Sequence, residues 1–199
     1  TFDADLWTAF RAGRQAPVPL IIGSNGLEFP TGAMSQAAAP LMKAMSETER
    51  ARIAAAYGGG PDAQAHVVSD VTFTGQVRAL ARMHARQGHP TWVYLFDVRS
   101  GAGNAKGAVH AAELRYVFDT LGGDALTAHD DVDRSVAKLM NAQWRAFATR
   151  GDPTGEGLPN WPRYDGQVLL EYRRESIAAH PDERAARLDV LAEIIDPRS

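Results

Sequence analysis

A carboxylate and a histidine, each following an apolar run that is typical of a strand, are the residues of this chain best suited to chemistry. Glu28 ends a polar turn after the apolar residues 18–22. His110 lies in a loop entered through Gly107, downstream of the aromatic and β-branched residues 91–96. A carboxylate that orients an imidazole makes a general base, which can activate a hydroxyl nucleophile. We therefore predict that Glu28 and His110 act together.

Each of these residues also has an ordinary explanation when taken alone. Glu28 could be a solvated carboxylate on a turn, and His110 could be a loop histidine with no catalytic role. Their joint arrangement favours chemistry, because reactive groups of open α/β sheets gather at the carboxyl ends of strands. A carboxylate that precedes a histidine is also the chain order in α/β-hydrolases, where the nucleophile comes before both.

The elements that would position these side chains alternate between strand and helix. Residues 18–22 and 91–96 lack polar alternation, which is typical of central strands covered on both faces. Three strands are fewer than the roughly five or six of an ordinary open sheet, so we expect part of a larger sheet. The class we predict is α/β, with a mostly parallel sheet and helices on both faces. The third predicted strand is 168–170. Residues 29–45 show no clear pattern of helix or strand, and they could form a pocket wall or lid. The predicted helices span residues 6–13, 46–58, 66–87, 130–150 and 183–195.

Several short segments resemble the type-B carboxylesterases, a family that includes cholinesterases and bacterial esterases acting on nitrobenzyl esters. The strand-to-acid segment is Val18-Pro19-Leu20-Ile21-Ile22-Gly23-Ser24-Asn25-x-x-Glu28. The histidine segment is Gly107-Ala108-Val109-His110-Ala111-Ala112-Glu113-Leu114. The other matching segments are residues 70–73, 92–97, 144–148, 151–153 and 160–164, in the order that the family has them. The resemblance therefore covers the chain from about Pro17 to Tyr164.

This resemblance implies that residues 1–199 are the C-terminal segment of a single α/β-hydrolase domain. It implies a serine-type carboxylic ester hydrolase in which Glu28 is the acid and His110 the base of a Ser-Glu-His triad. The family's nucleophile and oxyanion loop lie upstream of the acid, and the sequence contains no Gly-x-Ser-x-Gly. We therefore expect an N-terminal fragment of the same protein to carry the Gly-x-Ser-x-Gly nucleophile and to associate obligatorily with this chain. The expected substrate is a small-molecule ester.

Small departures from the family pattern occur beside the expected site. Phe29 follows the acid where a glycine is usual, so we expect a different pocket wall behind the carboxylate. Arg115 replaces a usual proline, and Thr154 a frequent asparagine, with small local effects. Ser24 lies inside the acid motif and lacks the strand-turn-helix context of a nucleophile, so we do not assign it that role.

Composition and charge argue against several other classes of function. The net charge of −3 gives no reason to expect nucleic acid or an anionic membrane as a partner. The chain has no cysteine and no apolar run of roughly 20 residues that could span a membrane. One cluster of basic residues occurs in the sequence, and we interpret it as the polar face and C-terminal end of an amphipathic helix. Its members are Arg78, Arg82, His84, Arg86 and His89.

Two histidine–carboxylate groups suggest metal ligation, but each has a simpler explanation. His110 with Glu113 belongs to the histidine motif, and His129 with Asp130 and Asp131 is typical of a helix start. We expect neither a metal nor another cofactor. The alternative function that we consider is a non-catalytic, cholinesterase-like interaction module. Because such a module has no chemical need for Glu28 and His110, their presence favours the enzyme.

Overall fold

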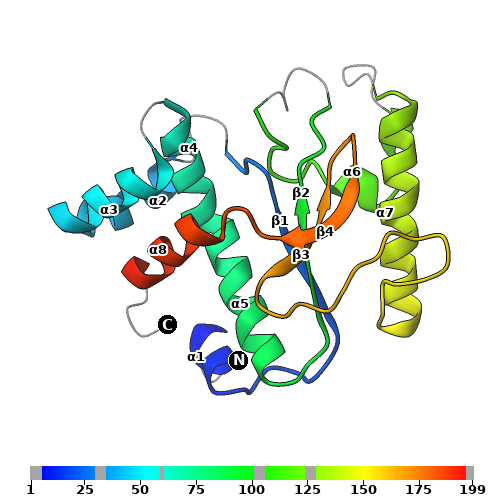
Figure 1. The fold of residues 1–199 in the computed structure, drawn as a ribbon, viewed down its shortest axis with the longest axis horizontal. Helices are drawn as coiled ribbons and strands as arrows, with labels where there is room; N and C mark the ends of the chain where they lie inside the picture. Colours follow the sequence, from blue (N-terminus) through cyan, green and yellow to red (C-terminus); the bar gives the residue numbers. More distant parts are fainter. Residues whose placement is uncertain (1–5, 30–34, 59–60, 101–105, 124–128, 196–199) are drawn as a thin grey trace.

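The computed structural model describes residues 6–29, 35–58, 61–100, 106–123 and 129–195. Its described strands form one sheet in the order β1-β2-β3-β4, near the centre of Figure 1. β1 runs parallel to β2 and β2 runs parallel to β3, whereas β3 and β4 form an antiparallel hairpin. The prediction of an α/β class with a mostly parallel sheet is therefore confirmed. The strands are β1 (Leu20–Asn25), β2 (Thr91–Phe96), β3 (Val168–Tyr172) and β4 (Ile177–Pro181).

Three details of the strand prediction are wrong. The third strand does not end at residue 170 but extends to Tyr172, which pairs with Ile177. The first strand begins at Leu20 and continues through Asn25, because its pairing with β2 extends to the register pair Asn25↔Phe96. The hairpin strand β4 was not predicted at all. Its sequence, Ile-Ala-Ala-His-Pro, has a single β-branched residue and a proline, so its propensity for strand is low. The antiparallel pairing with β3 outweighs that local preference.

Helices cover both faces of the sheet. Figure 1 shows α5 (Gly75–Arg86) on one side and α7 (Asp131–Arg150) on the other. Alternate side chains of β2 reach the two layers: Trp92 and Phe96 belong to the core cluster that contains residues of α7. Val93 packs in the cluster that contains Ala81 of α5. β2 is thus a central strand buried on both faces, as its continuous apolar run predicts.

Further helices form a second core beside the α5 layer. They are α2 (Ser35–Ala44), α3 (Glu47–Tyr57), α4 (Pro61–Ser69) and α8 (Ala185–Ile195), whereas α1 (Leu6–Arg11) has no buried residue and lies against α5. Ser46 and Glu49 form a capping box at the start of α3, which confirms the predicted helix start. The patternless segment 29–45 is largely α2, and its residues 30–34 lie outside the described part. Within it, Met42 and Met45 pack in this second core, so core packing accounts for them.

The predicted helix over residues 66–87 is in fact three consecutive segments. A π-helical turn (Asp70–Thr74) joins α4 to α5, and the Gly75 N–H donates to the Asp70 carbonyl oxygen five residues back. The extra residue of such a turn rotates the following helix face by about 100°. The assignment of the whole basic cluster to a polar face is wrong, since the Arg78 and His84 residues are only 7% and 3% exposed.

Both buried basic side chains have partners. Arg78 Nη1 lies 2.6 Å from Asp189 Oδ1 of α8, so this ion pair ties two helices together. His84 Nε2 lies 2.8 Å from the Val18 carbonyl oxygen, to which it donates. The guanidinium and the imidazole therefore make contacts inside the fold and do not belong to a basic surface patch.

The last long helix, α7, is set by its two ends. Asp130 accepts hydrogen bonds from the backbone N–H groups of Val132 and Asp133, and Gly151 ends the helix in the left-handed conformation. Although α7 has 20 residues, it is amphipathic. Among the helices that the structure describes, none has both the length and the apolar character to cross a membrane.

Candidate active site

The structure brings Glu28 and His110 into direct contact although 82 residues separate them in the chain. Glu28 Oε2 lies 2.7 Å from His110 Nδ1. The carboxylate is buried, with 4% of its surface exposed, whereas the imidazole side chain is 51% exposed. A buried carboxylate oxygen accepts the Nδ1 proton, so the neutral ring carries its lone pair on Nε2. This is the arrangement that a general base needs.

Backbone pairing beyond the ends of β1 and β2 creates this contact. The Leu27 N–H donates to the Ala108 carbonyl oxygen at 3.0 Å, and the His110 N–H donates to the Glu28 carbonyl oxygen at 3.0 Å. The acid segment and the histidine loop therefore lie side by side. Glu28 Oε1 in turn accepts the Asn25 N–H at 2.7 Å, so both carboxylate oxygens have partners.

Asp97, directly after β2, holds the histidine loop through a hydrogen bond to its backbone. Its side chain is 6% exposed, and Oδ1 accepts the Ala108 N–H at 3.0 Å. Two glycines leave room for this arrangement. A Cβ on Gly26 would lie 2.1 Å from Asp97 Oδ1, and a Cβ on Gly107, at φ +153°, would lie 2.7 Å from Leu27 Cβ. The glycines of both motifs are therefore required by close approach.

An aromatic cluster packs against the imidazole. The ring centroids of Phe73 and Phe29 lie 4.8 Å and 5.4 Å from that of His110. Phe73 reaches the site from the π-helical turn, and such turns are frequent at functional sites. Phe29 is the residue that departs from the family pattern, and its backbone N–H donates to Ser69 Oγ at 3.2 Å. The Phe29 ring contacts His110, and whether it changes the pocket wall behind the acid stays a prediction.

Backbone strain follows the histidine directly. Ala111 has φ +63°, a left-handed conformation that is uncommon for a residue with a Cβ. Such outliers persist where surrounding contacts over-determine them, and they cluster at functional sites. Here those contacts are the hydrogen bonds on either side of His110, which hold Ala108 and Glu113.

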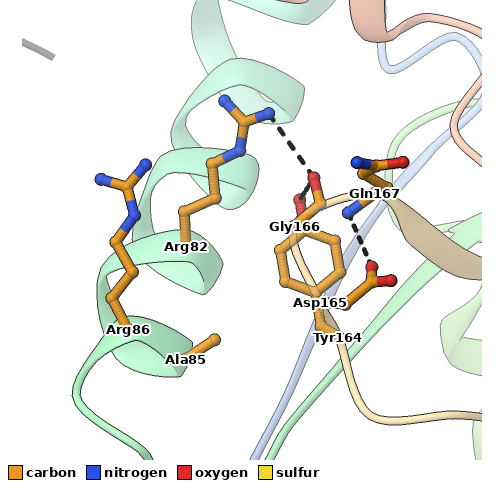
Figure 2. A pocket seen from close by; sticks show the side chains of 7 residues that line it. All are labelled: Arg82, Ala85, Arg86, Tyr164, Asp165, Gly166 and Gln167. Atoms are coloured by element: carbon orange, nitrogen blue, oxygen red, sulfur yellow. Dashed lines mark hydrogen bonds between the residues drawn. The ribbon is translucent and has the colours of Figure 1, made fainter.

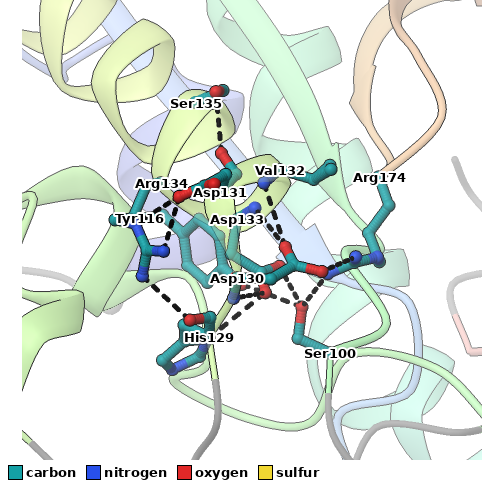
Figure 3. Close-up of polar contacts among 10 residues, drawn as sticks. All are labelled: Ser100, Tyr116, His129, Asp130, Asp131, Val132, Asp133, Arg134, Ser135 and Arg174. Carbon is teal, nitrogen blue, oxygen red and sulfur yellow. Dashed lines mark hydrogen bonds and ion pairs between the residues drawn. The ribbon is translucent and has the colours of Figure 1, made fainter.

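Figure 3 shows a second polar network, which holds both ends of the chain segment that carries His110. Ser100, at the start of that segment, donates to Asp133 Oδ1, and the Tyr116 hydroxyl at its end lies 3.1 Å from the same oxygen. Arg174 Nη1 adds an ion pair at 2.7 Å. Burial by itself would raise the pKa of Asp133, but the hydrogen bonds from Ser100, the Asp130 backbone and Arg174 outweigh burial and lower it.

The pocket in Figure 2 lies elsewhere and does not include the predicted site residues. It has a volume of about 430 Å³, and Arg82, Arg86 and Gln167 are among the residues that line it. Tyr164, which also lines the pocket, donates its backbone N–H to the carbonyl oxygen of Thr91, the first residue of β2. The pocket is therefore at the amino end of the parallel strands, opposite the end at which α/β sheets carry reactive groups.

The remaining candidates of the sequence analysis occupy structural positions. Ser24 is buried in β1, and among the described residues no serine has a hydrogen bond to His110. His129 precedes the capping residue Asp130, as the helix-start interpretation predicts, and its Nδ1 lies 3.8 Å from Asp133 Oδ2. Across the described ranges, no three histidine or acidic side chains are placed to hold a metal ion.

Sequence reasoning missed three residues that shape the site: Asn25, Asp97 and Phe73. Asn25 stands three residues before the acid and Asp97 directly follows a strand, so their spacing was a usable signal. Phe73 gave no such signal, because only the π-helical turn aims it at the histidine.

Comparisons with known proteins find similarity to carboxylesterases. The profile of the carboxylesterase family matches residues 42–187. Over 181 residues the chain is 31% identical to carboxylesterase 1D of Rattus norvegicus, covering 74% of this chain and 31% of that enzyme. It is 36% identical over 105 residues to the medium-chain fatty acyl-CoA hydrolase precursor of Anas platyrhynchos, covering 49% and 18%. It is 28% identical over 138 residues to the para-nitrobenzyl esterase of Bacillus subtilis, covering 63% and 28%.

These relatives bear on length and source as well. The chain spans between 18% and 31% of the length of the curated relatives named above. Because they come from a bird, a mammal and a bacterium, they do not support a bacterial source in particular.

Solved structures show the same fold. EstA of Aspergillus niger matches with a TM-score of 0.77 and 17% identity, covering 96% of this chain and 43% of that chain. A PNB esterase matches with a TM-score of 0.73 and 24% identity, covering 92% and 40%. The prediction that this chain forms part of an α/β-hydrolase fold is thereby confirmed.

Proposed function

Because the chain belongs to the carboxylesterase family, we propose that it supplies the acid and the base of a Ser-Glu-His triad that hydrolyses carboxylic esters. Glu28 is the acid and His110 the base. The serine and the oxyanion hole come from a polypeptide segment outside these residues. The observation that carries the proposal is the 2.7 Å contact between the buried Glu28 carboxylate and Nδ1 of the half-exposed imidazole.

The proposed reaction begins at His110 Nε2. This nitrogen accepts the proton of the serine hydroxyl while the serine oxygen bonds to the ester carbonyl carbon, which becomes a tetrahedral oxyanion. The imidazolium then gives the same proton to the alkoxide as the carbon–oxygen bond breaks, leaving an acyl-serine. Water repeats the sequence in the second half, releasing the carboxylic acid and regenerating the serine.

In the proposed reaction Glu28 acts through the ring and does not itself take up the transferred proton. Its Oε2 holds the Nδ1–H tautomer, so that Nε2 is free to accept a proton, and it stabilises the positive charge that develops on the imidazole. The hydrogen bond from the Asn25 N–H to Oε1 stabilises the charged carboxylate in its buried position.

The free edge of β1 supports association with a further segment. Among the described residues β1 pairs with β2 alone, yet its sequence begins with the apolar Leu-Ile-Ile. An apolar edge with unpaired backbone groups favours pairing with another strand. We infer that the segment carrying the Gly-x-Ser-x-Gly nucleophile adds its sheet to this edge.

The test uses the full-length polypeptide that contains this chain and a short-chain nitrophenyl ester as the probe. We expect turnover by the wild type and a fall in kcat of about 10²–10⁴-fold in His110→Ala, because general-base catalysis contributes that factor. Glu28→Gln should lose a comparable factor, since an amide cannot stabilise the imidazolium.

The chain offers a matched control in its other histidine–glutamate pair. His180 Nε2 lies 2.7 Å from Glu171 Oε2, on β4 and β3, away from the carboxyl end of β1. His180→Ala and Glu171→Gln should therefore leave kcat within about threefold of the wild type. Equal activity of His110→Ala and His180→Ala would refute the assigned base. A folded wild-type protein without ester turnover would favour the non-catalytic interaction module instead.

A further inference from the structure

Asn25 bonds the proposed acid, Glu28, and two residues that flank the proposed base, and its side chain has no part in the reaction described above. The residue ends β1 and is 2% exposed. Its backbone N–H binds Glu28 Oε1, as described above. Its side-chain Nδ2 donates to the Val109 carbonyl oxygen at 2.8 Å and to Glu113 Oε2 at 2.6 Å. These two acceptors stand immediately before His110 and three residues after it.

The orientation of the Asn25 amide is determined by its surroundings. Both groups in front of Nδ2 are acceptors, a carbonyl and a carboxylate. The reversed amide would place Oδ1 against two oxygens, which repel it. In the observed orientation Oδ1 is buried without a hydrogen-bond partner among the described residues. An asparagine that leaves its own acceptor unpaired to satisfy two acceptors of the histidine loop indicates that holding this loop is its function.

We propose that Asn25 is a positioning residue that locks the histidine loop in register with the acid, and this role rests on the triad assignment proposed above. The backbone N–H of Asn25 holds the rotamer of Glu28, and its side-chain amide fixes the position of the histidine loop at Val109 and Glu113. His110 is thus held from both flanks while its own ring is half exposed. Ala111, in its strained left-handed conformation, lies between Val109 and Glu113, so the two hydrogen bonds from Asn25 also help to maintain that conformation.

The sharpest perturbation is Asn25→Asp, which keeps the shape and replaces the donor by an oxygen. That oxygen would face the Val109 carbonyl at 2.8 Å and the Glu113 carboxylate at 2.6 Å, so both contacts become repulsive. A displacement of about 1 Å in a catalytic group costs on the order of 10²-fold. In the full-length polypeptide we expect kcat for the nitrophenyl ester to fall about 100-fold and KM to change less than about threefold.

A second substitution tests the donor–acceptor logic rather than the volume of the side chain. In Asn25→Asp with Glu113→Gln, the amide nitrogen at position 113 can donate to the new carboxylate and restore one of the two bonds. We expect the double variant to recover at least about tenfold in kcat over Asn25→Asp alone. A role in packing alone would give no recovery, because Glu113→Gln conserves size.

Asn141 provides the control. Its Nδ2 also donates to a backbone carbonyl, that of Val117 at 2.7 Å, and it joins α7 to the end of α6 (Leu114–Val117). Asn141→Asp makes the same chemical change away from the acid and should leave kcat within about threefold. If Asn25→Asp does not fold, Asn25→Ala, which removes the donor without adding charge, should still lower kcat by about tenfold.

The outcomes separate this role from the proposed function. If His110→Ala is inactive but the folded Asn25 variants keep kcat within about threefold of the wild type, the positioning role is refuted and the triad assignment stands. A double variant no more active than Asn25→Asp would also overturn it. If His110→Ala remains fully active, the triad assignment fails and the role of Asn25 fails with it.

Discussion

Replacing Gly26 by alanine should disconnect the histidine loop from the sheet, because a Cβ at this position meets the carboxylate of Asp97. The added atom would lie 2.1 Å from Oδ1 and 2.5 Å from Cγ, whereas carbon atoms in contact are about 3.5–4.0 Å apart. The carboxylate must move by more than about 1 Å. It then loses the hydrogen bond from the Ala108 N–H, now 3.0 Å long.

The size of the effect follows from the lost bond. A hydrogen bond to a charged group contributes about 1.5–3 kcal/mol when its partner is left buried, so the free energy of unfolding should fall by about that amount. The loop delivers His110 two residues after Ala108, and a shift of about 1 Å there lowers kcat by on the order of 10²-fold. Urea denaturation and nitrophenyl ester kinetics on the full-length polypeptide measure both quantities.

Two comparisons make this prediction specific. A Cβ on Gly122 would have no atom within 4 Å, so Gly122→Ala is a matched control that should change neither stability nor kcat. In an Asp97→Ala background the obstructing carboxylate is gone. Only the Cβ of residue 97, 3.1 Å away, then remains close to the added atom, so Gly26→Ala should cost much less than in the wild type, giving a coupling energy of most of the single-variant effect. Additive effects of the two substitutions, or a Gly26→Ala variant that behaves like Gly122→Ala, would refute the reasoning.

Three further predictions concern the network around the loop, the core and the ring cluster. The pKa of Asp133 is lowered in the folded state, so its ionised form stabilises the fold above the unfolded-state pKa of about 3.9. This contribution is lost as pH falls through the folded-state pKa. The urea midpoints of Asp133→Asn at pH 7 and pH 3 should therefore differ less than those of the wild type. Trp161 Nε1 donates to the Val93 carbonyl oxygen at 3.0 Å, so Trp161→Phe should lower the free energy of unfolding by about 1–3 kcal/mol in denaturant titrations, and unchanged stability would contradict the burial of that bond. Phe73→Ala removes a ring contact with His110 worth about 0.5–1.5 kcal/mol. The value of kcat/KM should therefore fall by up to about tenfold relative to Phe73→Leu. Equal values of kcat/KM for the two variants would exclude a ring-specific effect.

Local patterns predicted much of the fold. The run of residues 91–96 identified β2 to the residue, and the acidic start after Ser46 identified α3. Both depend on near neighbours in the chain: continuous apolar side chains in one case and a reciprocal cap over three residues in the other. The missed strand β4 shows the limit of such patterns, because its stability comes from pairing with β3 rather than from its own residues.

The sequence by itself determined which residues are the acid and base candidates, their order, and the glycines that flank them. Only the tertiary structure decided how they are held. Asn25 meets the histidine loop across 84 and 88 residues of chain, the π-helical turn places the Phe73 ring against the imidazole, and the buried Arg78 pairs with Asp189 of a distant helix. No local pattern encodes these contacts, since they arise when parallel pairing brings the ends of β1 and β2 together and the intervening helix packs onto them.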